Sequence, residues 1–180
     1  MKIMKITITV EKTKTFLKLC SILCVTTLTL FFLYINGYRI NVSNSLPYWI
    51  YKISDISGKT ISRGDYVVVN DSLITHSSAI KAGLDKRYLN RIPMLKQIGA
   101  VPGDVVLLQN SLLYVNGAEY GPMIVMSEDS RGNHFSPFPT PITLQSDQYW
   151  LVSNPYGGFD SRYFGWISRD YITHLAYPVF

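Results

Sequence analysis

The sequence predicts a mainly β fold: a compact, antiparallel, barrel-like domain joined to one N-terminal transmembrane helix. Two observations predict it. Residues Leu19 to Tyr38 form a run of 20 without a charge, and a helix of that length, at about 1.5 Å per residue, spans the roughly 30 Å of a bilayer's hydrocarbon core. After this run, short apolar stretches alternate with glycine, asparagine and proline turns, as is typical of antiparallel strands.

The chain is expected to divide into a basic tail (1–15), a transmembrane anchor (16–38) and one domain (39–180). Residues 1–18 carry five lysines against Glu11, a net charge of +4, whereas the remaining residues hold 12 basic and 11 acidic side chains. Lysines beside an apolar span favour the cytoplasmic side of the membrane. We therefore expect the domain to lie outside the cytoplasm, with the lipid bilayer as a partner of the apolar span.

A cleaved secretory signal is the alternative interpretation of the apolar run. Such signals need small residues before the cut site. Here Asn36-Gly37-Tyr38-Arg39 follows the run, and the first alanine of the chain is Ala79. The sequence favours an uncleaved anchor.

Charge and cysteine content exclude two classes of function for the domain. Its net charge is close to zero, and nucleic-acid binding needs a basic surface on the folded part, so no nucleic-acid partner is expected. Both cysteines, Cys20 and Cys24, lie inside the apolar run. The domain therefore has neither a disulfide framework nor a thiolate metal site, and we interpret the two cysteines as packing residues.

Strands account for most of the expected elements after residue 39. Asn110 marks one possible turn, and Asn116-Gly117 is a strong hairpin signal. A short helix is expected at Ser77–Tyr88, and the proline-rich stretch 127–141 predicts a long irregular loop. The expected strands are Asp65–Asn70, Asp104–Gln109, Ser111–Gly117 and Asp147–Ser153.

The stretch NVSNSLPYW, from Asn41 to Trp49, offers two candidate nucleophiles, Ser43 and Ser45. A serine hydroxyl needs a base, which is most often a histidine. The chain has three histidines, and none has a distinctive setting in the sequence, so each is interpreted as a surface or packing residue. They are His76, His134 and His174.

Lysine is the other candidate base. In the stretch RIPMLKQIGAVPGD, Lys96 is the only charge in a row of alternate residues, which share one face of a strand. Burial among apolar side chains lowers a lysine pKa by up to roughly 3–5 units, into the range that a general base needs. The alternative is an edge lysine whose ammonium reaches water. The apolar members of the row are Ile92, Met94, Ile98 and Ala100.

Four short motifs, in order, resemble the type I signal peptidases, which are membrane-anchored serine peptidases with a Ser/Lys dyad. The first is S-x-S-L, ending at Leu46, and the second is the strand RGDYVVV. The third runs from Lys96 to a P-G-D triplet that ends at Asp104, and the distance in sequence from the lysine to this triplet is the same as in the family. The fourth is DSRYFG, from Asp160 to Gly165. The resemblance covers nearly the whole chain and implies a signal-peptidase-type β domain.

The resemblance implies a role for each matched residue. Ser45 is expected to be the nucleophile and Lys96 its base, and the oxyanion hole is expected to form from the Ser45 N–H and the Ser43 hydroxyl. Asp160, Ser161 and Arg162 are expected to support the site. Asp160 and Arg162 either brace it through an ion pair or take part in the chemistry directly. No metal or organic cofactor is implied.

Further short matches resemble the conjugation-type TraF branch of that family. They comprise S-L-P after the anchor and the segments 129–132, 153–155 and 176–179. The resemblance implies a bacterial inner (plasma) membrane protein, single-pass, with its domain on the periplasmic side. It would process a pilin precursor or other exported pre-protein for conjugative type IV secretion, with pilin cyclisation as one outcome. The alternatives are a general signal peptidase and an inactive membrane-tethered scaffold.

The chain departs from the family pattern at four positions. Gly158 stands where the family usually has a serine that helps hold the lysine. Gln97 replaces a common arginine, Ile50 a glycine and Trp166 a proline.

Overall fold

The computed structural model describes residues 2–70, 93–128, 132, 134 and 136–180. Within it the chain forms two units, Met1–Tyr38 and Arg39–Phe180. The helix expected at Ser77–Tyr88 lies outside the described residues.

The first unit is one long helix, α1 (Lys2–Ile35). Its segment Lys12–Ile35 is long and apolar enough to cross a membrane, with a mean hydropathy of 2.1. The helix ends before Gly37, whose φ of 85° lies in the left-handed region that favours glycine. The helix includes the residues of the expected basic tail and ends at Ile35. The division of this region into a tail and a membrane anchor stays a prediction.

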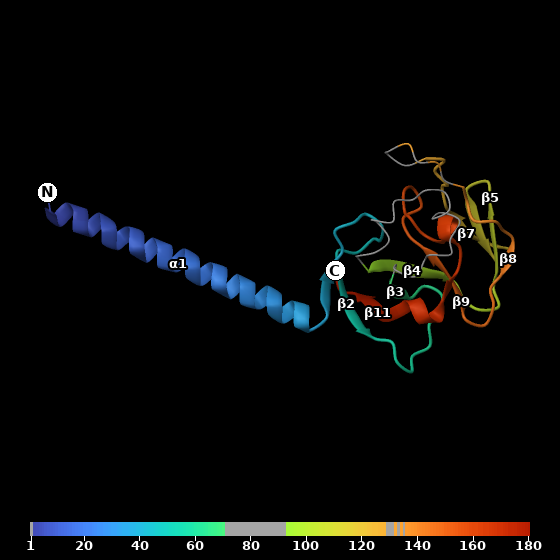
Figure 1. Ribbon diagram of the computed structural model, residues 1–180, viewed down its shortest axis with the longest axis horizontal. Helices are drawn as coiled ribbons and strands as arrows, with labels where there is room; N and C mark the ends of the chain where they lie inside the picture. The colour runs from blue at the N-terminus through green and yellow to red at the C-terminus, as the bar shows by residue number, and fades with distance from the viewer. Residues whose placement is uncertain (1, 71–92, 129–131, 133, 135) are drawn as a thin grey trace. The chain divides into compact units, whose positions relative to one another are not determined.

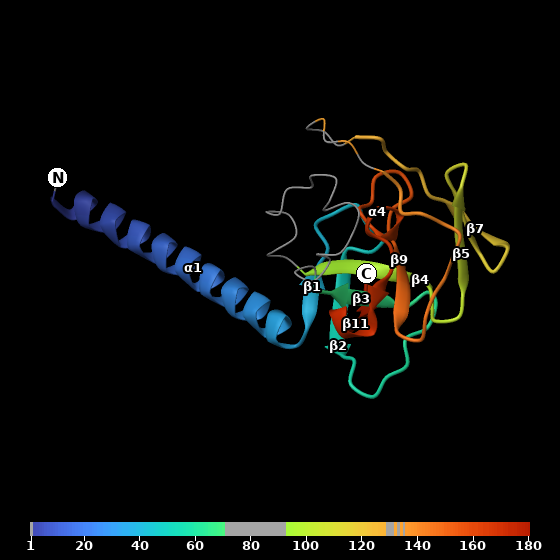
Figure 2. The same cartoon turned by 45° about the vertical axis from the view of Figure 1, so that its right-hand side comes forward.

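The second unit is built from two sheets whose pairings from β2 onward are antiparallel, so the mainly β prediction is confirmed. The larger sheet has the order β1-β2-β11-β3-β4-β9-β10, and the smaller has the order β7-β6-β5-β8. Among the described residues the larger sheet leaves β1 and β10 as edges, so it does not close into a barrel. Figure 1 shows β5, β7 and β8 gathered on one side of the domain, next to β9, and Figure 2 shows β5 and β7 on that side from a second angle.

The larger sheet comprises β1 (Tyr38–Ile40), β2 (Ile50–Asp55), β3 (Tyr66–Val69), β4 (Met94–Ala100), β9 (Gln148–Val152), β10 (Ile167–Ser168) and β11 (Ile172–Pro178). The smaller comprises β5 (Val105–Gln109), β6 (Leu112–Val115), β7 (Ala118–Pro122) and β8 (Ile142–Thr143). Two short helices complete the unit, α4 (Ser161–Phe164) and the 3₁₀ helix η2 (Arg169–Tyr171).

The predicted strands and turns agree with these elements. Strands β3, β5, β6 and β9 lie within the four predicted ranges. Asn110 and Ser111, with φ of 52° and 59°, form the turn between β5 and β6, while Asn116 and Gly117, with φ of 55° and 80°, form the next. Positive φ at both central residues is what a type I′ hairpin turn requires. Within 127–141, the described residues form no helix or strand beyond one isolated bridge.

Two hydrophobic clusters share β4 and β9. On β9, Leu151 packs into the first cluster, and its neighbours Trp150 and Val152 pack into the second. On β4, Ile98 belongs to the first cluster and Ala100 to the second, with an irregularity of the register between them. The prediction that Ala100 shares a face with Lys96 and Ile98 was therefore wrong, because simple alternation breaks down at this bulge.

Candidate active site

The loop between β1 and β2 carries both candidate serines, and Asn41 organises it. The Asn41 N–H donates to Trp49 O at 2.8 Å, and its amide nitrogen donates to Tyr48 O at 3.1 Å and to Leu46 O at 3.4 Å. Its amide oxygen accepts from the Ser43 N–H at 3.2 Å and from the Ser43 hydroxyl at 2.8 Å. One side chain thus joins both ends of the loop and orients Ser43.

The hydroxyl oxygens of Ser43 and Ser45 lie 2.6 Å apart. Each hydroxyl has one proton, so two arrangements are available. When Ser43 donates to Asn41, Ser45 donates to Ser43; when Ser43 donates to Ser45, the Ser45 proton is free for a base. Within the described part of the chain, the Ser45 N–H donates no hydrogen bond, so it remains available to a ligand.

Lys96 lies in the interior of the larger sheet. It is on β4, between β3 and β9, and pairs with Val67. Only 5% of the residue is exposed, and Met94 and Ile98, two positions away on either side, pack in the first hydrophobic cluster. The alternative of an edge lysine in contact with water is therefore wrong.

Burial lowers the Lys96 pKa from 10.5 to about 8, because the apolar surroundings disfavour the ammonium. The negative charge of Asp160 raises the pKa and the positive charge of Arg162 lowers it, so these two effects oppose each other. Desolvation is therefore the main cause of the shift.

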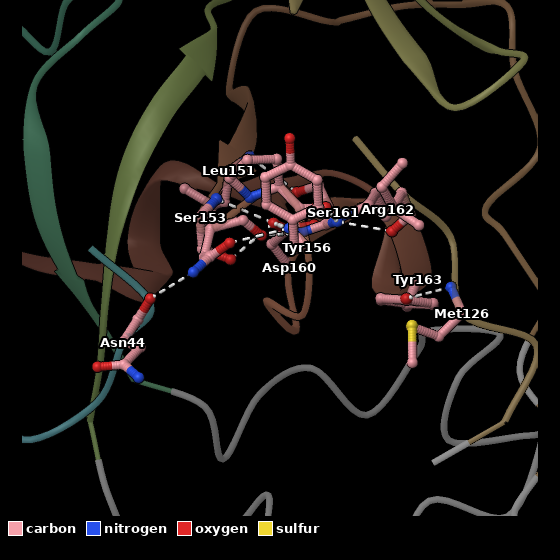
Figure 3. Close-up of polar contacts among 12 residues, drawn as sticks. Asn44, Met126, Leu151, Ser153, Tyr156, Asp160, Ser161, Arg162 and Tyr163 are labelled. Atoms are coloured by element: carbon pink, nitrogen blue, oxygen red, sulfur yellow. Dashed lines mark hydrogen bonds and ion pairs between the residues drawn. The ribbon is translucent and has the colours of Figure 1, made fainter. Parts of the chain in front are cut away.

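Asp160 and Arg162 form a completely buried ion pair, with 1% of each side chain exposed and 2.8 Å between Arg162 Nη2 and Asp160 Oδ2. Five hydrogen bonds reach the Asp160 carboxylate, from Arg162 N, Nε and Nη2 and from Ser153 N and Oγ. Dashed lines in Figure 3 show these contacts around Asp160. The remaining Arg162 donors bind the carbonyl oxygens of Ile124, Asn154 and Pro155.

The segment after β9 connects these parts of the site. Val152, its last strand residue, is opposite Gln97, the neighbour of Lys96. Ser153 binds Asp160, as described above, and Asn154 donates from its backbone to Ser45 O at 2.7 Å and from its side chain to Asn44 O at 2.8 Å. Three consecutive residues thus link the lysine strand, the ion pair and the serine loop.

Residues 13–179 match the family model described as signal peptidase, peptidase S26. The chain belongs to this family. Among curated proteins it is 28% identical over 153 residues to Conjugal transfer protein TraF of Agrobacterium fabrum strain C58, covering 81% of this chain and 84% of that protein. It is 30% identical over 151 residues to Probable conjugal transfer protein TraF of Sinorhizobium fredii strain NGR234, covering 80% and 77%.

Among solved structures, a signal peptidase I from Enterococcus faecalis V583 is 18% identical, with a TM-score of 0.40, covering 65% of this chain and 97% of that one. This likeness is too weak to bear on the site.

Within the family's D-S-R motif, the serine and the following turn have local structural partners. The Ser161 hydroxyl is fully buried and accepts from the Leu151 N–H at 2.8 Å. Gly165, at the end of α4, has a φ of 78°, and a Cβ there would collide with the Phe138 ring. Ser161 and Gly165 therefore fix the segment that carries Asp160 and Arg162. The first D-S-R, 129–131, lies outside the described residues.

The histidines that the structure describes are placed as follows. His134 is exposed in the long loop, and His174 lies on β11, paired with Asp55 and Val68. His76 lies outside the described residues. In the described part of the chain, no group of three or more His, Cys, Asp or Glu residues is placed to hold a metal ion.

Two residues of the site had no role assigned from sequence, Asn41 and Ser153. Each was inside a stretch already singled out, but neither carries a chemical signal of its own. Their roles depend on side-chain hydrogen bonds that only the folded loops create.

Proposed function

We propose that this protein is a membrane-anchored serine endopeptidase in which Ser45 is the nucleophile and Lys96 the general base. The observation that carries the proposal is the buried lysine. Lys96 is in the interior of the sheet with a pKa of about 8. Its neighbour Gln97 pairs with Val152, two residues before the Asn154 that binds Ser45 O. Perturbed lysines of this kind occur at functional sites because a base must be neutral to accept a proton.

The pKa of Lys96 sets how much working base is present. At pH 7, a lysine with a pKa of about 8 is neutral in roughly one molecule in ten, whereas an ordinary lysine is neutral in about one in a few thousand. The lowered pKa therefore raises the population of neutral base by more than about a hundredfold.

The proposed reaction has two stages. As Ser45 Oγ attacks the peptide carbonyl carbon, its proton passes to neutral Lys96, and the carbonyl oxygen becomes an oxyanion. The Ser45 N–H and the Ser43 hydroxyl stabilise this oxyanion. The C–N bond then breaks, the Lys96 ammonium returns the proton to the leaving amine, and an acyl-enzyme remains. In the second stage, water gives a proton to neutral Lys96 as its oxygen attacks the acyl carbon. The ester bond to Ser45 Oγ then breaks, the Lys96 ammonium returns the proton to Ser45, and the product leaves as a carboxylic acid.

In this mechanism Asp160 and Arg162 brace the site rather than react. Every hydrogen-bond donor of the Arg162 side chain is in use, and five donors surround Asp160. A carboxylate with about four acceptor positions has none left for a substrate proton. This bonding supports the bracing interpretation over direct chemistry.

The relatives named conjugal transfer protein support a substrate class. We propose that the substrate is an exported precursor, with a pilin subunit of a conjugative type IV secretion system as the leading candidate. An amine of the same pilin that replaces water in the second stage would give a cyclic product. The proposed location is the bacterial inner membrane, with α1 as the anchor and residues 39–180 on the periplasmic side.

The test is to incubate the purified full chain, in detergent micelles, with a pilin precursor and with unrelated signal-bearing pre-proteins, and to analyse products by mass spectrometry. Ser45→Ala is the matched control. Cleavage of the pilin alone supports the conjugation role, and a product lighter than the linear one by one water indicates a ring. Cleavage of all precursors indicates a general signal peptidase, and no cleavage indicates a scaffold.

The proposed topology has its own test. Protease added to spheroplasts is expected to digest residues 39–180. Protection of a domain that the same protease digests after lysis would contradict the periplasmic location.

A further inference from the structure

Ser153 and Gly158 share one small space beside the buried ion pair. Gly158 is buried, and a Cβ built on it would collide with the Ser153 hydroxyl and come within 2.9 Å of both Ser153 Cβ and the Asn154 carbonyl oxygen. The Ser153 hydroxyl thus stands where a side chain at position 158 would begin. The backbone of Gly158 does not lie in the left-handed region, so this space, rather than the backbone conformation, accounts for the glycine.

The Ser153 hydroxyl is directed at Asp160. It donates to Asp160 Oδ2 at 2.7 Å, and the Ser153 N–H donates to the same oxygen at 2.9 Å. Only 7% of Ser153 is exposed. A buried serine with both its donors on one carboxylate oxygen fixes the position of that carboxylate, and Figure 3 shows the two residues next to each other.

We propose that Ser153 is a positioning residue for Lys96. It fixes the Asp160 carboxylate, and Val152, its neighbour in the chain, lies on β9 opposite Gln97, the neighbour of Lys96 on β4. Its hydroxyl occupies the space that a side chain at position 158 would otherwise fill. The inference rests on the proposed function of Lys96 as a base. Because Gly158 has no side chain, it cannot supply a hydroxyl at this place. We infer that Ser153 supplies one instead.

The charged groups that act on Lys96 explain how Ser153 matters. They are Asp160 and Arg162, which shift the lysine pKa in opposite directions. Ser153 donates two of the five hydrogen bonds to Asp160, and the dipoles of these donors offset part of the negative field that Asp160 exerts on Lys96. Without the hydroxyl, more of the negative charge acts on the ammonium of Lys96 and stabilises it.

The direct test is the pKa of Lys96 in Ser153→Ala. Full-length protein in detergent micelles, labelled with ¹³C and ¹⁵N at lysine, is titrated by NMR, and Lys96→Arg assigns the signal. We expect the Lys96 pKa to rise by about 0.5–1 unit in Ser153→Ala, less than the roughly 1–3 units that a newly introduced opposite charge produces. Ser153→Cys, which keeps a weaker donor, should give a smaller rise. An unchanged or lowered pKa in both variants overturns the proposal.

Ser161→Ala is the matched control, because Ser161 is also a buried serine of the same segment but binds Leu151 N rather than Asp160. We expect it to lower the melting temperature without moving the Lys96 pKa. If it raises the pKa as much as Ser153→Ala, the effect is general loosening of the segment, and Ser153 has no special role.

The shared space has a separate test in Gly158→Ala. The added Cβ displaces the Ser153 hydroxyl, so we expect a lower melting temperature and a Lys96 pKa that shifts as in Ser153→Ala. In the double variant Ser153→Gly/Gly158→Ala, the clash with Ser153 is gone. Gly158→Ala should therefore lower the melting temperature less when it is added to Ser153→Gly than when it is added to the natural chain. An equal loss of melting temperature in the natural chain and in Ser153→Gly would show that the two residues do not compete for space. These readouts do not depend on cleavage, so they can fail or succeed independently of the proposed function.

Discussion

Two Asp–Arg ion pairs in the domain have the same length and different surroundings. Arg63 and Asp104 are 2.8 Å apart, with 42% and 9% of their side chains exposed. Arg162 and Asp160 are also 2.8 Å apart, with 1% of each exposed. Water screens the first pair but not the second, so the same contact has different energetic consequences.

The half-exposed pair holds a turn. Asp104 accepts from Arg63 Nη2, from the Val101 N–H and from the Asn116 amide, each at 2.8 Å. Burial alone would raise the Asp104 pKa, but these hydrogen bonds outweigh it and lower the pKa. Asp104 therefore ties the turn before β5 to the hairpin turn after β6. In the described part of the chain, none of its hydrogen-bond partners is a lysine.

The buried pair interacts electrostatically with a third buried group, the Lys96 ammonium. Lys96, Asp160 and Arg162 interact in the interior, where an uncompensated charge is costly. The comparison teaches that the length of an ion pair does not reveal its role. Burial makes the second pair part of the electrostatics of the site, and the following variants test this difference.

The largest effect on stability is expected from Arg162→Met. It leaves Asp160 charged, buried and without its guanidinium partner, which typically costs roughly 3–5 kcal/mol. We expect urea denaturation of the full chain in micelles to show a loss of that size. Asp160→Asn/Arg162→Met removes both charges, and it should cost less than Arg162→Met alone. A loss below about 1 kcal/mol for the single variant would place the buried pair in the same class as the exposed one.

Lys96→Met should make the protein more stable at neutral pH. Because the Lys96 pKa is about 8 in the fold and 10.5 as its ordinary value, the unfolded chain binds more protons between these values. The cost of burying the lysine, roughly 3 kcal/mol at 1.36 kcal/mol per unit, is therefore full below pH 8 and disappears as the pH rises to 10.5.

The measurement is the difference in free energy of unfolding between Lys96→Met and the natural chain, from pH 7 to pH 10. We expect a positive difference that shrinks as the pH rises through 8. Using the difference removes the contributions of other groups, including Tyr66 and Tyr120, whose pKa values burial raises. A difference that stays constant with pH would mean that Lys96 titrates normally.

The smallest effect is expected from Arg63→Ala. An ion pair with one partner this exposed contributes about 0.2–1 kcal/mol, and added salt should reduce the loss further. Because the Asp104 pKa lies below its ordinary 3.8, the stabilisation by Asp104 is present above that value and is lost as the pH falls through the lowered pKa. Asp104→Asn should therefore weaken the loss of stability in acid. A cost for Arg63→Ala as large as that for Arg162→Met would remove the contrast between the pairs.

The sequence predicted much of the site because local rules control those parts. Alternation along a strand offered a buried Lys96 as one of two interpretations, and a short motif that resembles the family assigned both loop serines to the site. Turn chemistry at Asn116-Gly117 gave the hairpin. In each case the residues that determine the feature lie within a few positions of it.

Other features depend on contacts distant in the chain. The bulge that separates Ile98 from Ala100 arises where β4 meets β9, and whether the large sheet closes depends on its two edge strands. The role proposed for Ser153 depends on its hydrogen bonds to Asp160, which the turn between these residues brings into contact with it. The glycine at position 158 is the one feature of the sequence that points to this arrangement. Pairwise packing of this kind leaves no periodic pattern.

The most direct test of the account is the pH dependence of precursor cleavage, compared between the natural chain and Lys96→Arg. Arginine keeps the positive charge but does not lose its proton in proteins. We predict that the rate for the natural chain rises with pH along a limb centred near 8, the pKa of Lys96, and that folded Lys96→Arg shows no cleavage at any pH. Cleavage by Lys96→Arg at the natural rate, with the same limb, would contradict the claim that Lys96 is the base for Ser45.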